Sequence, residues 1–446
     1  MGGTRGAWAI ALALAGCYSG PRGGDDGAGD GDADGSGSAD SGDSGDDGDT
    51  GAPACVGDPN DPGPMLLRRL THREYEATIR DLLGVDARTI VATFPADVTS
   101  GSFDNDAKNQ TISVLLGERY LDAAKALGAQ VVGDVALRDA VLGCDPAEGE
   151  SCLRAATERF GRRAFRRPLA ASEIDELVAL ALTQDAPADQ AAILIETVLM
   201  SPRFLFRVEV GTVDPDHPER AKLDGYEIAT RLAYFLWGTT PDDALLDAAA
   251  TGALDDAEGV AAMTETMLGD PRAKGTMAIF GEQWLRADTI VGQSRDAEQF
   301  PEWNESLQHA MVDELELRLD DAMWAEGADV LSLFTSTRGY VNDELAAIYG
   351  VTAPGGGELQ PFDHPADSER GGLFTTAAFA TASSRASDTS PVQRAMWVRT
   401  VALCDPPPPP PPSVPSLDPE DGESVQDAFE RHLGKGEECA GCHLQL

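Results

Sequence analysis

The segment Leu67–Asp86 reads LRRLTHREYEATIRDLLGVD, and it decides the fold class. Its portion Thr71–Glu74 has the pattern of a capping box, in which a hydroxyl and a carboxylate satisfy the first free N–H groups of a helix. Apolar side chains follow at helical spacing, and Gly84 suits the left-handed backbone of a helix end. These apolar residues are Tyr75, Ile79, Leu82 and Leu83. The segment therefore predicts a helix whose two ends are both encoded locally.

Helical periodicity recurs along the chain from about residue 64 to about residue 400. Further helices are expected at 113–132, 152–165, 173–184, 188–200, 224–237, 241–250, 257–268, 272–286, 304–325, 343–349 and 371–382. Ser172 is expected to cap the helix at 173–184. Alternating residues at 203–210 form the only fair strand candidate. We therefore predict a mainly α fold with a multi-helix body.

Composition excludes several functions. The 446 residues include 34 Lys and Arg against 76 Asp and Glu, which gives a formal charge of −42. Nucleic-acid binding without sequence preference and docking on anionic lipid both need clustered cations, so neither is expected. The sequence has no HExxH, GxSxG or P-loop motif, which argues against the enzyme classes that use them.

The first residues indicate export. Ala7–Ala15 is an apolar run too short to span a bilayer, as in a secretory signal. It ends in Leu14-Ala15-Gly16-Cys17, the pattern of a lipobox, so we expect residues 1–17 to be a lipoprotein signal with lipid on Cys17. The alternative is an ordinary signal peptide with a chance cysteine. Residue 18 is Tyr rather than Asp, which favours the outer membrane or the cell surface.

Two further segments have the composition of linkers. Residues 18–63 are rich in Gly, Asp and Ser, and such a chain buries too little apolar surface to fold, so we expect a disordered acidic tether. Pro406–Pro412 is a run of seven prolines, which predicts a stiff polyproline II spacer before a short C-terminal piece.

Seven cysteines support an oxidising compartment. Cys144 and Cys152 flank a short polar loop, so their disulfide is the favoured pairing. Cys55 with Cys404 then follows by elimination. Free buried thiols are the alternative for all four.

The sequence Cys439-Ala440-Gly441-Cys442-His443 is a CxxCH motif. This spacing attaches haem c, because two thiols form thioethers with the vinyl groups and the adjacent imidazole ligates the iron. We therefore expect covalent haem c on Cys439 and Cys442, with His443 as the iron ligand. A zinc half-site and a CxxC thiol pair are the alternatives.

Four parts of the chain resemble a set of domain families first described in planctomycetes and common in other exported bacterial proteins. The first resemblance is Leu67–Asp86, and the second rests on Phe165–Leu169 and Ser201–Arg207. The third rests on Tyr226–Trp237, Asp270–Arg272 and Gln283–Leu285. The fourth resembles the planctomycete cytochrome c-type domain through Arg370–Leu373, Ser390–Arg394, the proline run and the CxxCH.

The resemblance implies three surface domains at 64–132, 144–211 and 222–350, followed by a cytochrome c-type domain at 366–446. The family's domain continues beyond its CxxCH, whereas only Leu444, Gln445 and Leu446 follow here, so we expect a truncated domain. No downstream Met can be the sixth iron ligand. Met396 and His432 are upstream candidates, with core packing and a solvated helix position as their alternatives.

Two further sets of residues are weaker candidates for a binding site. Arg162, Arg163, Arg166 and Arg167 form a basic cluster that could hold an anionic glycan or a haem propionate. We favour local pairing with acids such as Glu173 and Asp175. Five Trp residues could form a sugar platform, but core packing is favoured. They are Trp237, Trp284, Trp303, Trp324 and Trp397.

Two functions therefore remain open, and the sequence does not decide whether the protein is an enzyme. The first is a membrane-tethered haem protein of the cell envelope that passes electrons to or from a periplasmic or surface redox partner, or supports a periplasmic oxidation. The second is a non-redox scaffold or adhesion lipoprotein whose haem motif is vestigial. The intact CxxCH and the export signal favour the first.

Overall fold

A computed structural model describes residues 64–99, 101–215, 217–218 and 220–405, together with Asp427, Glu430 and Arg431. The expected signal sequence, tether, proline spacer and CxxCH segment lie outside these residues. Within the described part, the predicted mainly α fold is confirmed, and the strands are short antiparallel pairs.

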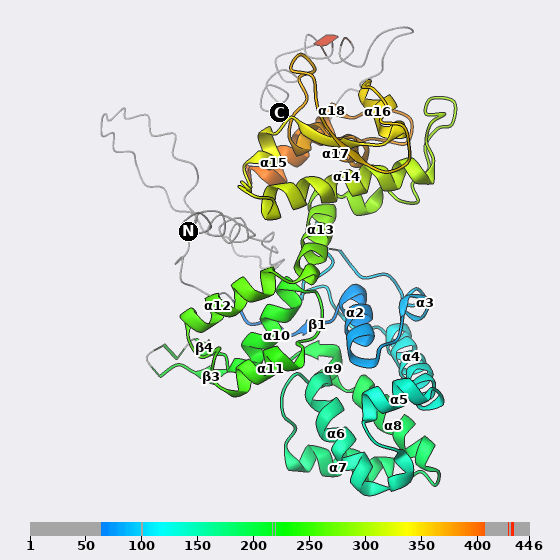
Figure 1. The fold of residues 1–446 in the computed structure, drawn as a ribbon, viewed down its shortest axis with the longest axis vertical. Helices are drawn as coiled ribbons and strands as arrows, with labels where there is room; N and C mark the ends of the chain where they lie inside the picture. Colours follow the sequence, from blue (N-terminus) through cyan, green and yellow to red (C-terminus); the bar gives the residue numbers. More distant parts are fainter. Residues whose placement is uncertain are drawn as a thin grey trace, which may run out of the picture.

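The described chain forms two lobes that helix α13 (Pro271–Leu285) connects (Figure 1). We call residues 64–268 the N-terminal lobe. Its elements are β1 (Arg68–Arg69), α2 (His72–Leu83), α3 (Arg88–Val91), α4 (Val114–Gly133), α5 (Val135–Leu142), η2 (Pro146–Glu148), α6 (Glu150–Ala164), α7 (Ala171–Ala181), α8 (Pro187–Met200), α9 (Pro202–Leu205), β2 (Phe206–Arg207), β3 (Thr212–Val213), β4 (Ala221–Lys222), α10 (Gly225–Leu236), α11 (Asp243–Ala250) and α12 (Ala257–Leu268).

We call residues 287–405 the C-terminal lobe. Its elements are η3 (Ala287–Thr289), α14 (Glu305–Trp324), α15 (Ser332–Thr335), β5 (Arg338–Val341), α16 (Asp343–Tyr349), β6 (Gln360–Asp363), η4 (Leu373–Thr375), α17 (Ala377–Ala382), α18 (Pro391–Trp397) and the π-helical turn η5 (Val398–Ala402). Strands β5 and β6 pair antiparallel, with Arg338 opposite Asp363.

Helix α2 forms as its sequence predicts. The Thr71 hydroxyl accepts from the N–H of Glu74, and the Glu74 carboxylate accepts from the N–H of Thr71 at 2.9 Å. Gly84 ends the helix with φ of 71°, in the left-handed region. Tyr75, Ile79 and the two leucines of the predicted face are buried. The local pattern therefore sets both ends of the helix and its buried face.

Three expectations were wrong. The segment 203–210 is mostly not a strand: Ser201 caps the short helix α9, and only Phe206–Arg207 pairs with β1. Ser172 does not cap α7, because that helix begins at Ala171, two residues before the expected start, and Glu173 accepts from the N–H of Ala170 at 2.8 Å. The helix expected at 371–382 is broken into η4 and α17 at Thr376, whose extended backbone caps α17.

Each lobe has its own core. One buried cluster gathers α2, α4, α6, α7 and α8, and a smaller one joins α10, α11 and α12. A third lies in the C-terminal lobe and includes residues of α14, α16, α17 and α18. Helices α17 and α18 therefore pack into the same core as α14 and α16.

Tyr234 of α10 links three parts of the N-terminal lobe. Its hydroxyl lies 3.0 Å from the Thr78 hydroxyl of α2, and Arg166 donates to it at 3.2 Å. The buried Arg166 guanidinium also donates to carbonyl oxygens at Arg203, Phe204 and Phe206. A single phenol therefore connects α2, the turn after α6 and α10.

A disulfide joins Cys144 to Cys152, with an S–S distance of 1.99 Å and a Cα–Cα distance of 5.7 Å. It ties the turn after α5 to the first turn of α6. Cys404 is a free, exposed thiol in the structure, and Cys55, the partner expected for it, lies outside the described residues.

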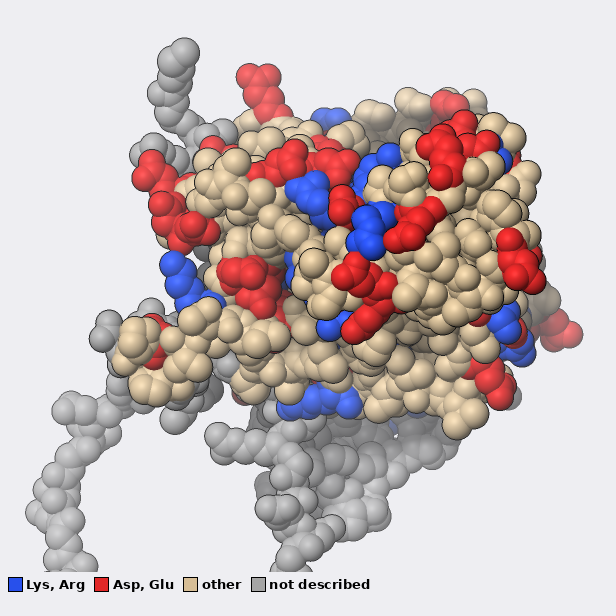
Figure 2. Space-filling model, turned by 90° about the horizontal axis from the view of Figure 1, so that it is seen from below, with Lys and Arg blue, Asp and Glu red and all other residues tan. Residues whose placement is uncertain are grey.

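Acidic side chains are spread over the face seen in Figure 2, with Lys and Arg beside many of them. Numerous short ion pairs join the two signs, such as Arg162–Asp247 at 2.6 Å. Among the described helices, none combines the length and apolarity that a bilayer crossing requires.

Candidate functional site

The structure describes one of the residues expected to reach the haem iron. Met396 lies near the end of α18, where it is half-buried. It is not among the core residues or the side chains packed against them, so the core interpretation of Met396 gains no support. Cys439, Cys442, His443 and the other candidate ligand, His432, lie outside the described residues.

Helix α18 is short and begins at a local signal. The Ser390 hydroxyl accepts from the N–H of Gln393, and Pro391 occupies the first helical position, where its missing N–H costs nothing. Trp397 ends the helix, and the π-helical turn η5 follows at once. Such turns are rare and occur frequently at functional sites.

Trp397 is held within a cluster of aromatic rings. Its ring centroid lies 5.5 Å from that of Trp284 on α13, 5.7 Å from Phe374 and 5.2 Å from Phe379. Only 7% of Trp397 is exposed. Within the described residues, its indole N–H has no acceptor although it is buried. The indole is therefore fixed in place, with one donor left unused.

The aromatic cluster continues toward the N-terminal lobe. Trp284 lies 6.1 Å from Phe280 of the same helix, with nearly parallel rings. Phe280 in turn stacks on Phe103 at 5.8 Å. A row of rings therefore runs from Phe103, through α13, to Trp397 at the end of α18.

Arg394 lies three residues before Trp397, so the two side chains share one face of α18. Its Nη1 donates to the Thr389 hydroxyl at 2.6 Å, and no carboxylate of the described chain pairs with it. Burial lowers the pKa of its guanidinium. Among the described residues, Arg394 therefore lacks a counter-ion, and the buried Trp397 indole N–H lacks an acceptor.

A buried polar network lies beneath this region, around α14. Arg318 donates to the Glu314 carboxylate at 3.0 Å, and Tyr349 donates to the other oxygen of the same carboxylate. The phenol oxygen of Tyr349 accepts from the N–H of Ala377 at 2.8 Å. Burial raises the pKa of Glu314 despite the nearby Arg318 guanidinium, and burial with the Glu314 charge raises that of Tyr349 well above its usual range.

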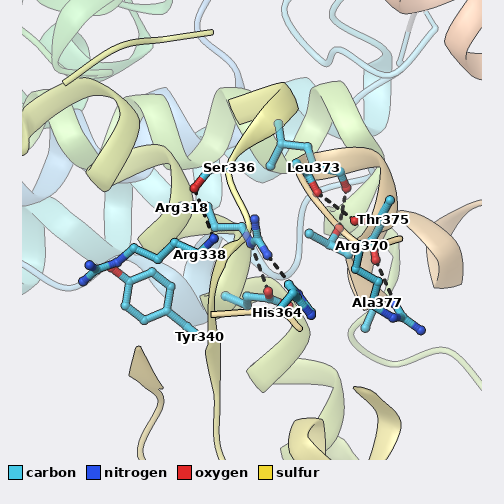
Figure 3. A network of polar contacts seen from close by, with 12 residues as sticks. Arg318, Ser336, Arg338, Tyr340, His364, Arg370, Leu373, Thr375 and Ala377 are labelled. Carbon is cyan, nitrogen blue, oxygen red and sulfur yellow. Dashed lines mark hydrogen bonds and ion pairs between the residues drawn. The ribbon is translucent and has the colours of Figure 1, made fainter. Parts of the chain in front are cut away.

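His364 completes this network (Figure 3). Its Nε2 lies 3.4 Å from an Arg318 nitrogen, which can only donate, so Nε2 is the acceptor and His364 is neutral. Burial, reinforced by the Arg318 and Arg370 charges, lowers the pKa of His364 to about 4. Arg370 donates to the Thr375 carbonyl at 3.0 Å and lies over the ring of Tyr349. The network joins α14 and α16 to η4 and α17, which indicates a structural role.

A carboxylate pair lies where α13 meets α14. Burial, and then the neighbouring Glu316, raises the pKa of Glu282 to about 7. Burial, and then Asp313, also raises the pKa of Glu316. Glu316 and Asp313 line a surface cavity of about 650 Å³ beside α14. In the described part of the chain, no group of three or more His, Cys, Asp or Glu could hold a metal ion.

Two arginines of the basic cluster pair with carboxylates, as expected, whereas Arg163 and Arg166 donate to carbonyl oxygens. Arg167 pairs with Glu173 at 2.8 Å, which confirms that expectation. Arg162 instead pairs with an aspartate of α11. Asp175 pairs with Arg154 at 2.7 Å and not with the basic cluster, so the role expected for Asp175 was wrong. The α11 partner of Arg162 is far from it in the sequence, so the sequence analysis did not predict this pair.

Core packing is also the better account of the tryptophans. Trp397 is a core residue, Trp284 and Trp303 pack against the same core, and Trp237 packs against the core of α10–α12. The indole N–H of Trp324 donates to the Leu268 carbonyl at 3.3 Å.

Four sequence families match the chain. Residues 68–133 match PSD3 (DUF1587), residues 152–209 match PSD5 (DUF1595), residues 223–351 match PSD4 (DUF1592) and residues 370–446 match PSCyt3 (DUF1588), each described as a protein of unknown function. These are the planctomycete surface and cytochrome c-type families. The chain carries all four planctomycete-type domains. No curated protein and no solved structure matches it.

Several of the polar contacts described above join residues that belong to different families. Tyr234 of PSD4 bonds to Thr78 of PSD3 and to Arg166 of PSD5. Tyr349 of PSD4 accepts from the N–H of Ala377 of PSCyt3, and Arg318 of PSD4 contacts His364, which lies between the two matched segments. The four domains are therefore joined by buried polar contacts. The sequence contained the donors and acceptors but no sign of their pairing.

Proposed function

We propose that the chain is a c-type haem protein of the cell envelope that exchanges electrons with a redox partner. The observation that carries this proposal is the PSCyt3 match at residues 370–446, which includes the CxxCH at Cys439–His443. A cytochrome c-type family and a haem-attachment motif coincide in the same segment of sequence.

The motif residues have separate roles in this proposal. Cys439 and Cys442 hold the haem through two thioethers, and His443 ligates the iron. Bound haem supplies one-electron exchange between ferrous and ferric iron. The protein would set the reduction potential through axial ligation, burial and hydrogen bonds around the group.

The residues that would hold the group lie outside the part of the chain that the structure describes. The chemistry of this donor set, two thiols and an adjacent imidazole at the spacing of a haem c site, therefore supports the proposal.

Haem attachment is tested directly. The protein, expressed in a host with a complete cytochrome c maturation system, should give a pyridine haemochrome spectrum. Cys439→Ala or Cys442→Ala should lose covalent attachment at one vinyl position, and His443→Ala should weaken iron ligation. Cys404→Ser, which changes an exposed free thiol, is the matched control. Wild-type protein without covalent haem would favour the non-redox scaffold or adhesion function instead.

The proposal places the protein at a membrane through lipid on Cys17, with residues 18–63 as a tether. The outer membrane or the cell surface is favoured because Tyr follows the cysteine. Cys17→Ala should leave an unprocessed or soluble precursor on fractionation of cells. A Cys17→Ala protein that still fractionates with membranes would contradict the anchor.

A further inference from the structure

A surface cavity of about 550 Å³ lies along helices α7 and α8 of the N-terminal lobe, and we call it the α7–α8 cavity. Its volume is within the range of about 300–1,000 Å³ that is typical of small-molecule sites. Its apolar lining comes from α4, α7, α8 and the end of α6, through Leu121, Phe165, Leu177, Leu180 and Met200. Leu180 is 44% exposed, so an apolar group in this cavity would remove hydrocarbon surface from water.

One end of the α7–α8 cavity carries a positive charge that the protein only partly neutralises. Arg167 donates to both oxygens of the Glu173 carboxylate, at 2.9 and 2.8 Å, and these bonds hold the pKa of Glu173 at about 2. Arg203 also contacts Glu173, through its Nε at 3.1 Å. A single carboxylate cannot neutralise two guanidinium groups. The Arg203 side chain, which is 54% exposed and lines the cavity, therefore keeps donors for an anion.

Two further carboxylates line the same cavity, from two different helices. They belong to Glu176 of α7 and Glu196 of α8, and no cation of the described chain pairs with either. The neighbouring Thr197 hydroxyl donates to the Ile193 carbonyl at 2.7 Å, so its oxygen can still accept. Unpaired carboxylates are common in a chain of charge −42. These two differ from the others because an arginine and an apolar wall share their cavity.

The helix geometry sets the order of these charges along the cavity. Only residues 182–186 connect α7 to α8, so the two helices are antiparallel neighbours. The start of α7, with Glu173, therefore lies beside the end of α8, which leads to Arg203. Glu176 lies three residues further along α7, about 5 Å along its axis. A cation and a carboxylate about one helical turn apart, beside apolar side chains, suit a small zwitterion with an apolar group.

We propose that the α7–α8 cavity binds a free amino acid with a large apolar side chain. Its carboxylate would bind Arg203, its ammonium group would bind Glu176 and Glu196, and its side chain would pack against Leu177 and Leu180. A purely anionic or purely cationic ligand would satisfy only one of the two charges. This site is separate from the haem motif and does not depend on haem attachment.

The test measures binding of three probes to the full-length protein by isothermal titration calorimetry. L-phenylalanine carries both charged groups and should bind saturably, with a Kd below about 1 mM. Phenethylamine lacks the carboxylate, and 3-phenylpropionate lacks the ammonium group. Each should bind about tenfold more weakly than L-phenylalanine, because each loses one charge-assisted contact.

Two charge variants assign the contacts. Arg203→Gln should weaken binding of L-phenylalanine about tenfold and leave that of phenethylamine unchanged. Glu196→Gln should weaken binding of L-phenylalanine and phenethylamine but not that of 3-phenylpropionate. Arg80→Gln and Glu158→Gln are the matched controls, because both side chains are exposed and neither lines the cavity. Neither control should change the affinity for L-phenylalanine, and thermal melts by circular dichroism establish that every variant folds.

The outcomes separate this inference from the proposed function. The absence of saturable binding of L-phenylalanine up to about 10 mM would overturn the inference. Phenethylamine that binds as tightly as L-phenylalanine would overturn it as well, because the contact with Arg203 would then contribute nothing. Equal losses in the site variants and the controls would reveal a general charge effect and also overturn it. Each of these results leaves the haemochrome test of the proposed function unaffected.

Discussion

Glu282→Gln should remove a pH dependence from the stability of the inter-lobe helix α13. Glu282 is half-buried at the contact of α13 with α14, and burial with the neighbouring Glu316 raises its pKa from 4.5 to about 7. Arg73 opposes this rise without reversing it, and Asp288 adds to it. A glutamine of the same shape cannot ionise, so it isolates the contribution of the charge.

The sign follows from proton binding. Below pH 4.5 the group is protonated in both the folded and the unfolded state, so Glu282 carries no ionisation penalty there. Between pH 4.5 and about pH 7 only the folded state holds the proton, so the free energy of unfolding falls as the pH rises. Above about pH 7 the group is ionised in both states and the penalty is complete.

The magnitude follows from the size of the shift. At about 1.36 kcal/mol per pKa unit, a rise from 4.5 to about 7 corresponds to at most about 3.4 kcal/mol. Glu282 is half-buried, so solvent screening reduces this to about 1–2 kcal/mol. We expect Glu282→Gln to match the wild type near pH 4 and to exceed its stability by that amount at pH 8.

The assay is urea unfolding, followed by circular dichroism at intervals from pH 4 to pH 8. Glu265→Gln on α12 is the control, because that side chain is exposed and leaves the carboxylate pair intact. Stability curves of wild type and Glu282→Gln that run parallel across this range would refute the assignment of a raised pKa.

The remaining predictions concern stability. Replacing Cys144 and Cys152 together by Ser should lower the free energy of unfolding by about 2–3 kcal/mol, and equal stability under reducing and oxidising conditions would contradict it. Arg318→Met should cost about 3–5 kcal/mol, because it leaves the buried Glu314 charge unpaired; Arg318→Met with Glu314→Gln should recover much of that loss in urea melts. Tyr234→Phe should cost about 1–3 kcal/mol by removing the hydroxyl shared by three domains, and a two-state midpoint equal to wild type would count against that link.

Several structural features were accessible from the sequence because they depend on neighbours in the chain. The capping box at Thr71 and Glu74 and the helix end at Gly84 involve hydrogen bonds and backbone angles within one element. The loop between Cys144 and Cys152 is short enough that proximity favours their pairing. The CxxCH is likewise a local pattern, so its chemistry could be proposed without a structure.

Only the tertiary structure decided how the domains meet and where the unused polar groups lie. Thr78 and Tyr234 are 156 residues apart, and Arg166 reaches carbonyls about 40 residues away, so no periodicity or spacing could have paired them. The same holds for the raised pKa of Glu282, which depends on burial between two helices. Local propensity specifies an element through short-range hydrogen bonds, whereas burial and partner choice depend on the whole packed chain. The sequence therefore determined the helices and the haem motif, and the packing decided which side chains of distant elements meet.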